Sequence, residues 1–510
     1  MIISLSVLVI TIIVSGTYAL YKAQLSKNIG VNTTTHGLAY YINYVKGTDI
    51  TAATLNPSTS YEGGASSDIE FWKKDDSYDI YGKIELTVNT IGTNLSNSPA
   101  LKYAVVNNGN VLKEGSLKGT TSGSKVTILK NLYLEQTKQI YTVYVWLDNS
   151  EELGNISNES LSISVDCTAS LQKEPTAADT IISLYTSAAK VTATNNSITY
   201  NTAPSVSLMN DRLGGTTTDL DGGNIRYYGA NPNNYIYFNC SDYSNQTSST
   251  CETWRIIGVF DGKLKLIRGS QIGKYSWDNK NTSTGAENDA GKNDWTTARL
   301  MKLLNPSNYY KVDSNDNNLG QSLYYNSASG KCYSGQNNAT VDCDFTSTGI
   351  KNAETRNMIA ETTYNLGGWN SNSVYSNQIY EYERGTTVYS GRPTTWKGKI
   401  ALAYPSDYGY AADLNQCKDK TLYDYDNRTC TSNNWMKAII TNNGSNTGWL
   451  LTPRSGSSSN AWYVNSGGFV SRDSIAYVAY GAVPVLSLSS ELGIESGGDG
   501  SSSKPYKLSA

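Results

Sequence analysis

Histidine is almost absent from this chain of 510 residues, which contains only His36. Hydrolytic sites of the Ser-His-Asp or Cys-His type need an imidazole beside the nucleophile, and the sequence has no G-x-S-x-G motif either. An excess of one charge is also missing, since 41 basic residues face 44 acidic ones. The chain therefore lacks the positive field that attracts nucleic acid. We expect no histidine-dependent hydrolase and no nucleic-acid partner.

Long apolar runs are missing except at the start, from Ile2 to Val14. That run is shorter than the ~20 residues of a membrane span and closer to the apolar part of a secretory signal. Small residues follow, with Thr17 and Ala19 at positions typical of a signal-peptidase site, although no basic segment precedes the run. Residues 1–20 are interpreted as a signal peptide or an uncleaved anchor. Either one predicts an extracellular, cell-surface protein that meets the membrane only through this segment.

Seven cysteines agree with export, because disulfides persist in oxidising compartments. Six of them lie in local pairs without the C-x2-C spacing of zinc sites. Spacing alone leaves the connectivity open, and neighbour pairing predicts three short loops: Cys240 with Cys251, Cys332 with Cys343, and Cys417 with Cys430. The seventh, Cys167, is in phase with the apolar residues of "LSISVDC", which predicts a buried, inert thiol.

Residues 21–168 show the alternation of half-buried strands. The segments "KIELTVNT" and "YTVYVWLDN" are apolar at every second position, and Asn108-Gly109 lies between apolar runs, as in a tight hairpin. These patterns predict a β-sandwich domain. Residues 169–205 are interpreted as a linker with one short helix.

Residues 206–489 predict a second, α+β domain. Asp261-Gly262 joins two apolar runs in a hairpin, and "NDWTTARLMKLLNP" predicts a helix capped by Asn293 or Asp294. A second helix is expected in "KNAETRNMIAETTYNLGG", and short strands separated by long loops make up the rest. Residues 490–510 are of low complexity and predict a flexible tail.

Tyrosine is abundant, with 39 Tyr against 5 Phe, and Ser, Gly and Asn are frequent. These residues favour binding surfaces, because Tyr offers a large contact area and the others offer adaptable hydrogen bonds. A bias toward AT-rich codons explains the same composition, so both interpretations stay open.

The N-terminal part, through "VSGTYALYKAQLSKNIGVN" and "YTVYVWLDNSEELGNISNESLSISV", resembles the camelysin and TasA-type proteins of Gram-positive bacteria. The resemblance implies an exported, jelly-roll-like β-sandwich of cell surfaces or biofilm matrix. The metalloprotease activity described for camelysin-type members is not transferred, because this chain has no HExxH motif.

Residues 225–489 resemble a C-type-lectin-like domain of the formylglycine-generating-enzyme type, found in surface proteins of gut Firmicutes and of unknown function. The matching segments include "WRIIGVF", "YSGRPTTWKGKIALAYPSDYGYA" and "NAWYVNSGGFVS". Where the family tends to read Val-Arg-Pro-Val, this chain has Ala482-Val483-Pro484-Val485. The resemblance implies a fold with long loops pinned by disulfides, and no activity.

The calcium motifs of sugar-binding lectins, EPN or QPD with WND, are missing. The acidic segments "DSNDNN" (313–318) and "DLDGG" (219–223) fit the spacing of calcium loops poorly. No cofactor is expected, and a structural calcium stays possible in a lectin-like domain.

The loop 455–460 in "GWLLTPRSGSSSNAWYVNSGGFVS" has no helix after it, so it does not fit a phosphate cradle. In lectin-like folds the polar residues near these late strands commonly form the ligand face. We expect ligand binding, with no catalytic residue, at Arg454, Asn460, Trp462, Tyr463, Asn465, Arg472 and Tyr477. Core packing is the alternative interpretation of Trp462, since large aromatic side chains are often buried.

The sequence thus favours a non-catalytic surface protein that binds a glycan or a protein ligand. One alternative is the structural subunit of a surface fibre or biofilm matrix, with homo-oligomers formed through the β-sandwich. Another is a polysaccharide-acting enzyme with two carboxyl groups across one cleft.

Overall fold

The structure is a computed structural model, and it divides the chain into two compact units, Met1–Glu174 and Pro175–Ala510. The predicted signal or anchor lies outside the described residues. Within the described ranges no helix is both long and apolar enough to cross a bilayer. The residues that the structure describes are 23–25, 41–51, 55–151, 153–156, 158–195, 198–213, 222–279, 290–311, 319–335, 338–417, 419–444 and 446–509.

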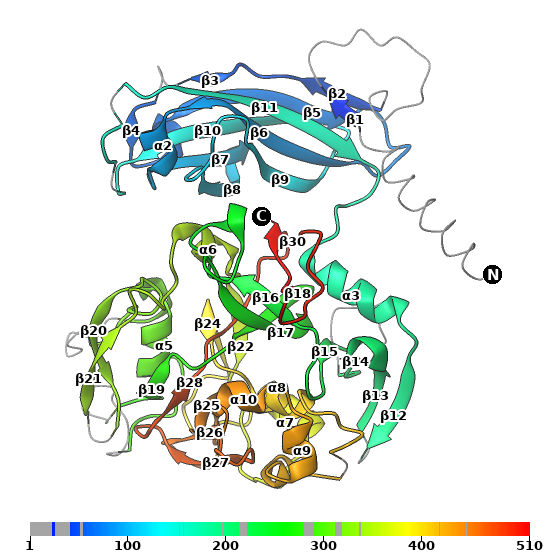
Figure 1. Ribbon diagram of the computed structural model, residues 1–510, viewed down its shortest axis with the longest axis vertical. Helices are drawn as coiled ribbons and strands as arrows, with labels where there is room; N and C mark the ends of the chain where they lie inside the picture. The colour runs from blue at the N-terminus through cyan, green and yellow to red at the C-terminus, as the bar shows by residue number, and fades with distance from the viewer. Residues whose placement is uncertain are drawn as a thin grey trace, which may run out of the picture. The chain divides into compact units, whose positions relative to one another are not determined.

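The first unit consists of two mainly antiparallel sheets around one hydrophobic core (Figure 1). One sheet has the order β1-β11-β6-β9, with β3 beside β11, and the other has the order β2-β5-β10-β7-β8, with β4 beside β10. The short helix α2 (Thr93–Asn97) completes the unit. Its strands are β1 (Ala23–Leu25), β2 (Ile42–Val45), β3 (Ile50–Thr51), β4 (Pro57–Ser58), β5 (Ala65–Lys73), β6 (Tyr81–Ile91), β7 (Leu101–Asn107), β8 (Asn110–Ser116), β9 (Lys125–Tyr133), β10 (Ile140–Asp148) and β11 (Leu161–Ser170).

Alternation along the strands builds this core, as the sequence predicts. Ile84, Leu86 and Val88 of β6 are fully buried. The predicted hairpin is confirmed, because Asn108 and Gly109 both have positive φ, 49° and 76°, between β7 and β8. Cys167 is free and buried, and burial raises the pKa of its thiol well above the usual value, which keeps it protonated.

In its described part, the second unit contains a nine-stranded and a five-stranded sheet, with short helices and three two-stranded sheets. The large sheet has the order β12-β13-β14-β15-β17-β18-β29-β24, with β16 beside β17: β12 (Val191–Asn195), β13 (Ile198–Ala203), β14 (Leu208–Asn210), β15 (Ile225–Tyr227), β16 (Tyr235–Phe238), β17 (Glu252–Phe260), β18 (Lys263–Arg268), β24 (Ile400–Ala401) and β29 (Val485–Ser487). The smaller sheet has the order β19-β28-β25-β26-β27: β19 (Gly273–Ser276), β25 (Gly448–Pro453), β26 (Asn460–Val464), β27 (Val470–Ile475) and β28 (Ala479–Ala482).

Short helices and two-stranded sheets fill the rest of the second unit. The two-stranded sheets are β20 (Ser329–Tyr333) with β21 (Thr340–Asp344), β22 (Thr362–Asn365) with β23 (Thr395–Gly398), and β30 (Gly493–Ile494) with β31 (Leu508–Ser509). The helices are α3 (Ala177–Ser187), α5 (Arg299–Leu304), α6 (Ala353–Met358), α7 (Ser376–Glu383), α8 (Pro405–Tyr410), α9 (Arg428–Ser432) and α10 (Lys437–Ile440).

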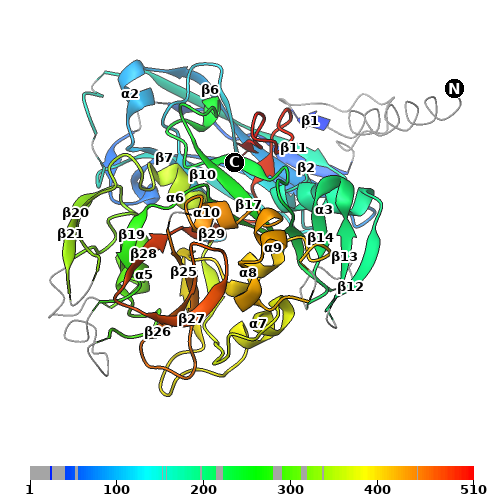
Figure 2. The same ribbon diagram turned by 60° about the horizontal axis from the view of Figure 1, so that its bottom comes forward.

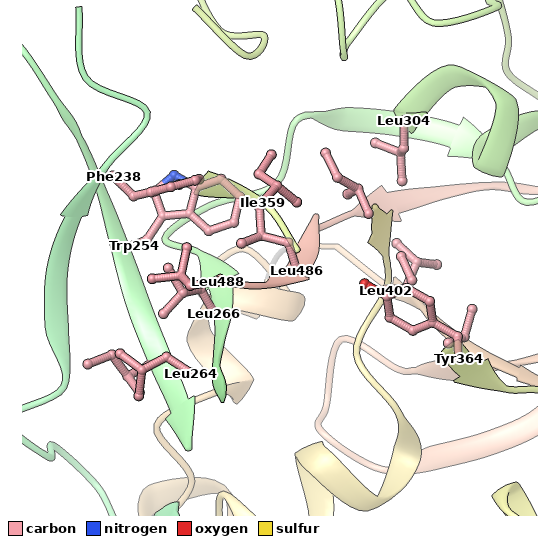
Figure 3. Close-up of a cluster of buried hydrophobic side chains, with 14 of the residues drawn as sticks. Phe238, Trp254, Leu264, Leu266, Leu304, Ile359, Tyr364, Leu402, Leu486 and Leu488 are labelled. Atoms are coloured by element: carbon pink, nitrogen blue, oxygen red, sulfur yellow. The ribbon is translucent and has the colours of Figure 1, made fainter. Parts of the chain in front are cut away.

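The centre of the second unit is formed by apolar side chains of the large sheet and its neighbours. Figure 3 shows Trp254, Leu266 and Leu486 gathered there, and all three are buried. The hairpin predicted at Asp261-Gly262 is confirmed, with φ of 48° and 70° at the two turn residues. The three predicted disulfides are confirmed as well: Cys240 with Cys251, Cys332 with Cys343, and Cys417 with Cys430.

The predicted linker and tail both belong to the second unit. Helix α3 buries Ile181 and Tyr185 in the main core, and β12 and β13 extend the large sheet. Residues 490–510 were expected to be flexible, but Tyr506 and Leu508 are buried in the same core, and Tyr506 exchanges backbone hydrogen bonds with β16. The sequence did not reveal these contacts, because only a few apolar residues, among them Tyr506 and Leu508, dock this otherwise polar segment.

The helices differ from the prediction in length and number. The first predicted helix begins only at Arg299, because the Asp294 carboxylate accepts bonds from the Thr296 N–H and hydroxyl and forms a separate turn. The second is α6, which ends at Met358, and the chain continues into β22. Residues 405–410, expected within a strand region, form α8 instead.

Candidate functional site

The described part of the second unit offers a surface rather than a deep pocket. Two hollows, one in each unit, measure about 20 and 10 Å³. That is room for little more than a water molecule. Neither hollow has room for a sugar ring or a peptide side chain.

Five aromatic side chains follow one another along the five-stranded sheet, and we call them the aromatic strip. Ring centroids are 4.7 Å apart between Trp449 and Tyr480, 5.4 Å between Tyr480 and Tyr463, 6.5 Å between Tyr463 and Phe469, and 5.3 Å between Phe469 and Tyr423. The contributing strands β28, β25, β26 and β27 lie together in Figure 2.

Strand register places the strip on one face of the sheet. Trp449 pairs with Tyr463, and Tyr463 pairs with Ser471, so the three side chains point to the same side. The neighbouring residues Leu450 and Trp462 point to the other side, into a second core cluster.

Exposure increases along the strip from the core outward. Trp449 is buried, Tyr480, Tyr463 and Phe469 are half-buried, and Tyr423 is 47% exposed. Burial raises the pKa of Tyr463, and a hydrogen bond with Ser471 opposes that effect. The Tyr463 hydroxyl therefore stays protonated at neutral pH and is able to donate a hydrogen bond.

A set of charged and amide side chains adjoins the strip, and we call it the polar cluster. The Asp473 carboxylate accepts from Arg454 Nη1 at 2.7 Å and from Arg472 Nη1 at 2.5 Å. Arg454 Nε donates to Asn370 Oδ1 at 2.8 Å, and Asn372 Nδ2 donates to Asp473 Oδ2 at 3.3 Å. Arg472 Nε is buried and has no hydrogen-bond partner among the described residues.

Strand β27 joins the polar cluster to the aromatic strip. Ser471 lies opposite Tyr463, and its hydroxyl donates to Asn372 Oδ1 at 3.4 Å. The Asp473 carboxylate is also close enough to contribute to the raised pKa of Tyr463. Aromatic faces and polar groups thus form one continuous surface.

The structure brings together three of the seven predicted ligand-binding residues, namely Arg454, Tyr463 and Arg472. Trp462 was predicted to bind ligand, and this is wrong, because its side chain is 0% exposed and packs in the core on the far face of the sheet. Tyr477 is half-buried, and its carbonyl oxygen accepts from the Ser276 hydroxyl.

Asn460 and Asn465 shape loops. Asn460 Oδ1 accepts from Ser457 and Ser459 hydroxyls, and Asn465 Oδ1 accepts from the Gly467 N–H. The residues that the sequence did not single out are Asn370, Asn372, Tyr423, Phe469, Asp473 and Tyr480. The first three come from segments remote in the chain, so no local pattern could connect them to β27.

No group of three or more His, Cys, Asp or Glu side chains suited to a metal occurs in the described part of the chain. The acidic segment 313–318 lies outside that part, as does most of the segment 219–223. A structural calcium therefore stays a prediction from sequence.

No model of a known protein family matches the sequence, and a search of curated proteins finds no match either. The surface therefore has to be interpreted from its own chemistry.

Proposed function

We propose that this protein is exported to the cell surface and binds a glycan through the aromatic strip and the polar cluster, without catalysing a reaction. Three disulfides fit an oxidising, extracellular setting. The resemblance of residues 225–489 to C-type-lectin-like domains, and of the first unit to jelly-roll proteins of the camelysin and TasA type, supports the same function.

The observation that carries this proposal is that half-buried aromatic rings and the Arg454–Asp473–Arg472 group adjoin each other at β26 and β27, where Tyr463 pairs with Ser471 and where burial and Asp473 raise the pKa of Tyr463. The apolar C–H faces of a sugar pack on aromatic rings, while its hydroxyl groups need planar donors and acceptors at the edge of the ring. Tyr423 and Phe469 offer the faces, and Asp473, with its two arginines, offers acceptors and donors. A peptide ligand would use the same groups, so a protein ligand is the other outcome of the test.

Binding of the full chain to glycan and protein arrays tests the proposal. The double variant Tyr423→Ala with Tyr463→Ala is expected to weaken glycan binding at least about tenfold, equivalent to about 1.4 kcal/mol. The matched control is Tyr78→Ala. Tyr78 belongs to the first unit, lies outside the strip and is 45% exposed, an exposed fraction similar to the 47% of Tyr423. Absence of glycan binding by the wild-type chain, or equal binding by the double variant, would contradict the proposal.

A surface-fibre subunit is the second candidate function. Among the described strands, the sheet β2-β5-β10-β7-β8 has β2 and β8 at its two edges, and both strands carry exposed apolar side chains: Val45 is 53% exposed, Val111 43% and Leu112 40%. Unpaired edge strands of this kind pair with other chains, and head-to-tail pairing builds open filaments. Electron microscopy of the purified chain would show filaments if this candidate is correct, and Val111→Lys would suppress them.

A further inference from the structure

Two opposite charges meet in the interior of the second unit. Lys265 of β18 and Asp407 of α8 are 142 residues apart in sequence, and Lys265 Nζ contacts Asp407 Oδ2. Lys265 is 6% exposed and Asp407 is 2% exposed. Desolvating an ammonium and a carboxylate is costly, and their attraction offsets the cost only in part.

The surroundings of this pair exclude water and hold the carboxylate in place. The rings of Phe260 and Tyr404 lie 5.0 and 4.6 Å from Lys265 Nζ. Asp407 Oδ2 also accepts from the Tyr404 N–H at 3.0 Å, and Oδ1 accepts from Arg226 Nη1 at 3.2 Å. Both oxygens of Asp407 are therefore fixed, with the amine on one side and a guanidinium on the other.

We propose that Lys265 and Asp407 condense to an intramolecular isopeptide bond. Lys265 Nζ attacks Cγ of Asp407, and a carbon–nitrogen bond forms. The bond between Cγ and Oδ2 breaks, and Oδ2 leaves as water with the two protons that the ammonium group gives up. An ammonium and a carboxylate are thus converted into an amide and water, without oxidant, reductant or any other reactant.

The neighbouring groups act on the amine and on the carboxyl group in different ways. Burial lowers the pKa of Lys265, with Asp407 opposing that effect, so the buried ammonium loses a proton more readily than an exposed one. Burial raises the pKa of Asp407, but Lys265 and Arg226 outweigh it and lower that pKa, so the carboxyl group is ionised and the protons of the departing water have to come from Lys265. Negative charge develops on Oδ1 as Nζ attacks, and the Arg226 Nη1 donor is already in place to stabilise it.

The charge balance of the interior also favours the product. Arg226 Nε donates to Asp211 Oδ2 at 2.5 Å, so Arg226 keeps an anionic partner after Asp407 becomes neutral. Two buried charges are replaced by one amide, whose carbonyl oxygen is able to accept from Arg226. Exclusion of water then protects the amide from hydrolysis.

Mass spectrometry of the wild-type full chain tests the proposal. After the N-terminus has been established by peptide mapping, the reduced and denatured chain is expected to be lighter than its sequence by one water molecule. Proteolysis is expected to yield a branched peptide that contains both Lys265 and Asp407. An intact mass equal to that of the sequence would overturn the proposal.

Two controls locate the missing water. Asp261-Gly262 in the adjacent turn could lose water as a succinimide, so a loss that maps to Asp261 instead of a branched peptide would also overturn the proposal. Lys265→Met is expected to restore the full mass, while Lys263→Met, on the same strand, is expected to keep the loss. Because the masses are measured on denatured chains, a folding defect in Lys265→Met leaves the wild-type result decisive.

Discussion

Trp462 and Tyr463 are adjacent in β26 and have opposite surroundings. Trp462 packs in the core cluster beneath the five-stranded sheet, and Tyr463 lies half-exposed in the aromatic strip. Because successive side chains of a strand point to opposite faces, variants of the two residues separate folding stability from the proposed ligand binding.

Trp462→Ala is expected to lower the free energy of unfolding by about 3–5 kcal/mol, because it leaves a large cavity. Tyr463→Ala is expected to cost clearly less stability and to weaken ligand binding. Denaturant unfolding and binding isotherms of both variants provide the measurement. A Trp462→Ala protein with wild-type stability would show that the residue is not in the core.

Glu383 is a buried acid that makes stability depend on pH. Its carboxylate is 0% exposed and accepts from the Ser406 N–H at 2.9 Å and from the Ser406 hydroxyl at 2.5 Å. Burial raises its pKa to about 7, although Arg384 and the hydrogen bonds from Ser406 oppose the shift. The folded chain therefore keeps this proton up to about pH 7, whereas the unfolded chain releases it near the usual carboxyl pKa.

The free energy of unfolding is accordingly expected to fall as the pH rises from about 5 to 7, by up to about 1.4 kcal/mol per pH unit for such a group. Asp278, whose pKa burial also raises to about 7, adds a contribution of the same sign. Glu383→Gln keeps the buried shape and should flatten the slope in urea-unfolding curves across this range. An unchanged slope would mean that Glu383 is ionised in the folded state.

Sequence patterns could predict the aromatic strip only in part. Two aromatic residues in a row, as at Trp462 and Tyr463, fit either face of a strand, and the pairing partners decide which one is buried. The register between β26 and β27 shifts at this place, which a pattern of period two does not reveal. Asn370 and Asn372 reach Arg454 and Asp473 from another part of the chain, and only the tertiary fold makes them neighbours.

At the scale of elements, strands and tight turns were predictable, and three helices were predictable as α3, α5 and α6, although the last two are shorter than predicted. Asn108-Gly109 and Asp261-Gly262 form turns because their own conformational preferences decide the structure. Helix α6 ends earlier than predicted, because Ile359 forms an antiparallel β-bridge with Leu488 and the chain then continues into β22. Tertiary pairing of this kind overrides helix propensity.

The segment that contains β30 and β31 is expected to be stably docked. The Leu492 carbonyl accepts from the Ala177 N–H at the start of α3, and the Tyr506 carbonyl accepts from the Tyr237 N–H of β16. Hydrogen exchange should therefore show slow amide exchange at Ala177 and Tyr237. Removal of residues after Ser489 should accelerate exchange at both amides, and fast exchange in the intact chain would contradict the docking.

At the scale of the whole molecule, the two units have separate hydrophobic cores, and all three disulfides lie in the second unit. Differential scanning calorimetry is expected to show two transitions. A reductant should lower the midpoint of one of them, because each short disulfide loop contributes about 3 kcal/mol. The other transition should stay unchanged, and a shift in both would show that the units unfold together.

Helix α3 is the first element of the second unit, and residues 492–509 dock in the same core through Leu492, Tyr506 and Leu508. During synthesis, α3 and β16 leave the ribosome long before these partners exist. The second unit is therefore unable to complete its fold until the docking segment has been translated. If the chain is exported as proposed above, that delay keeps it in the unfolded form that a translocation channel accepts.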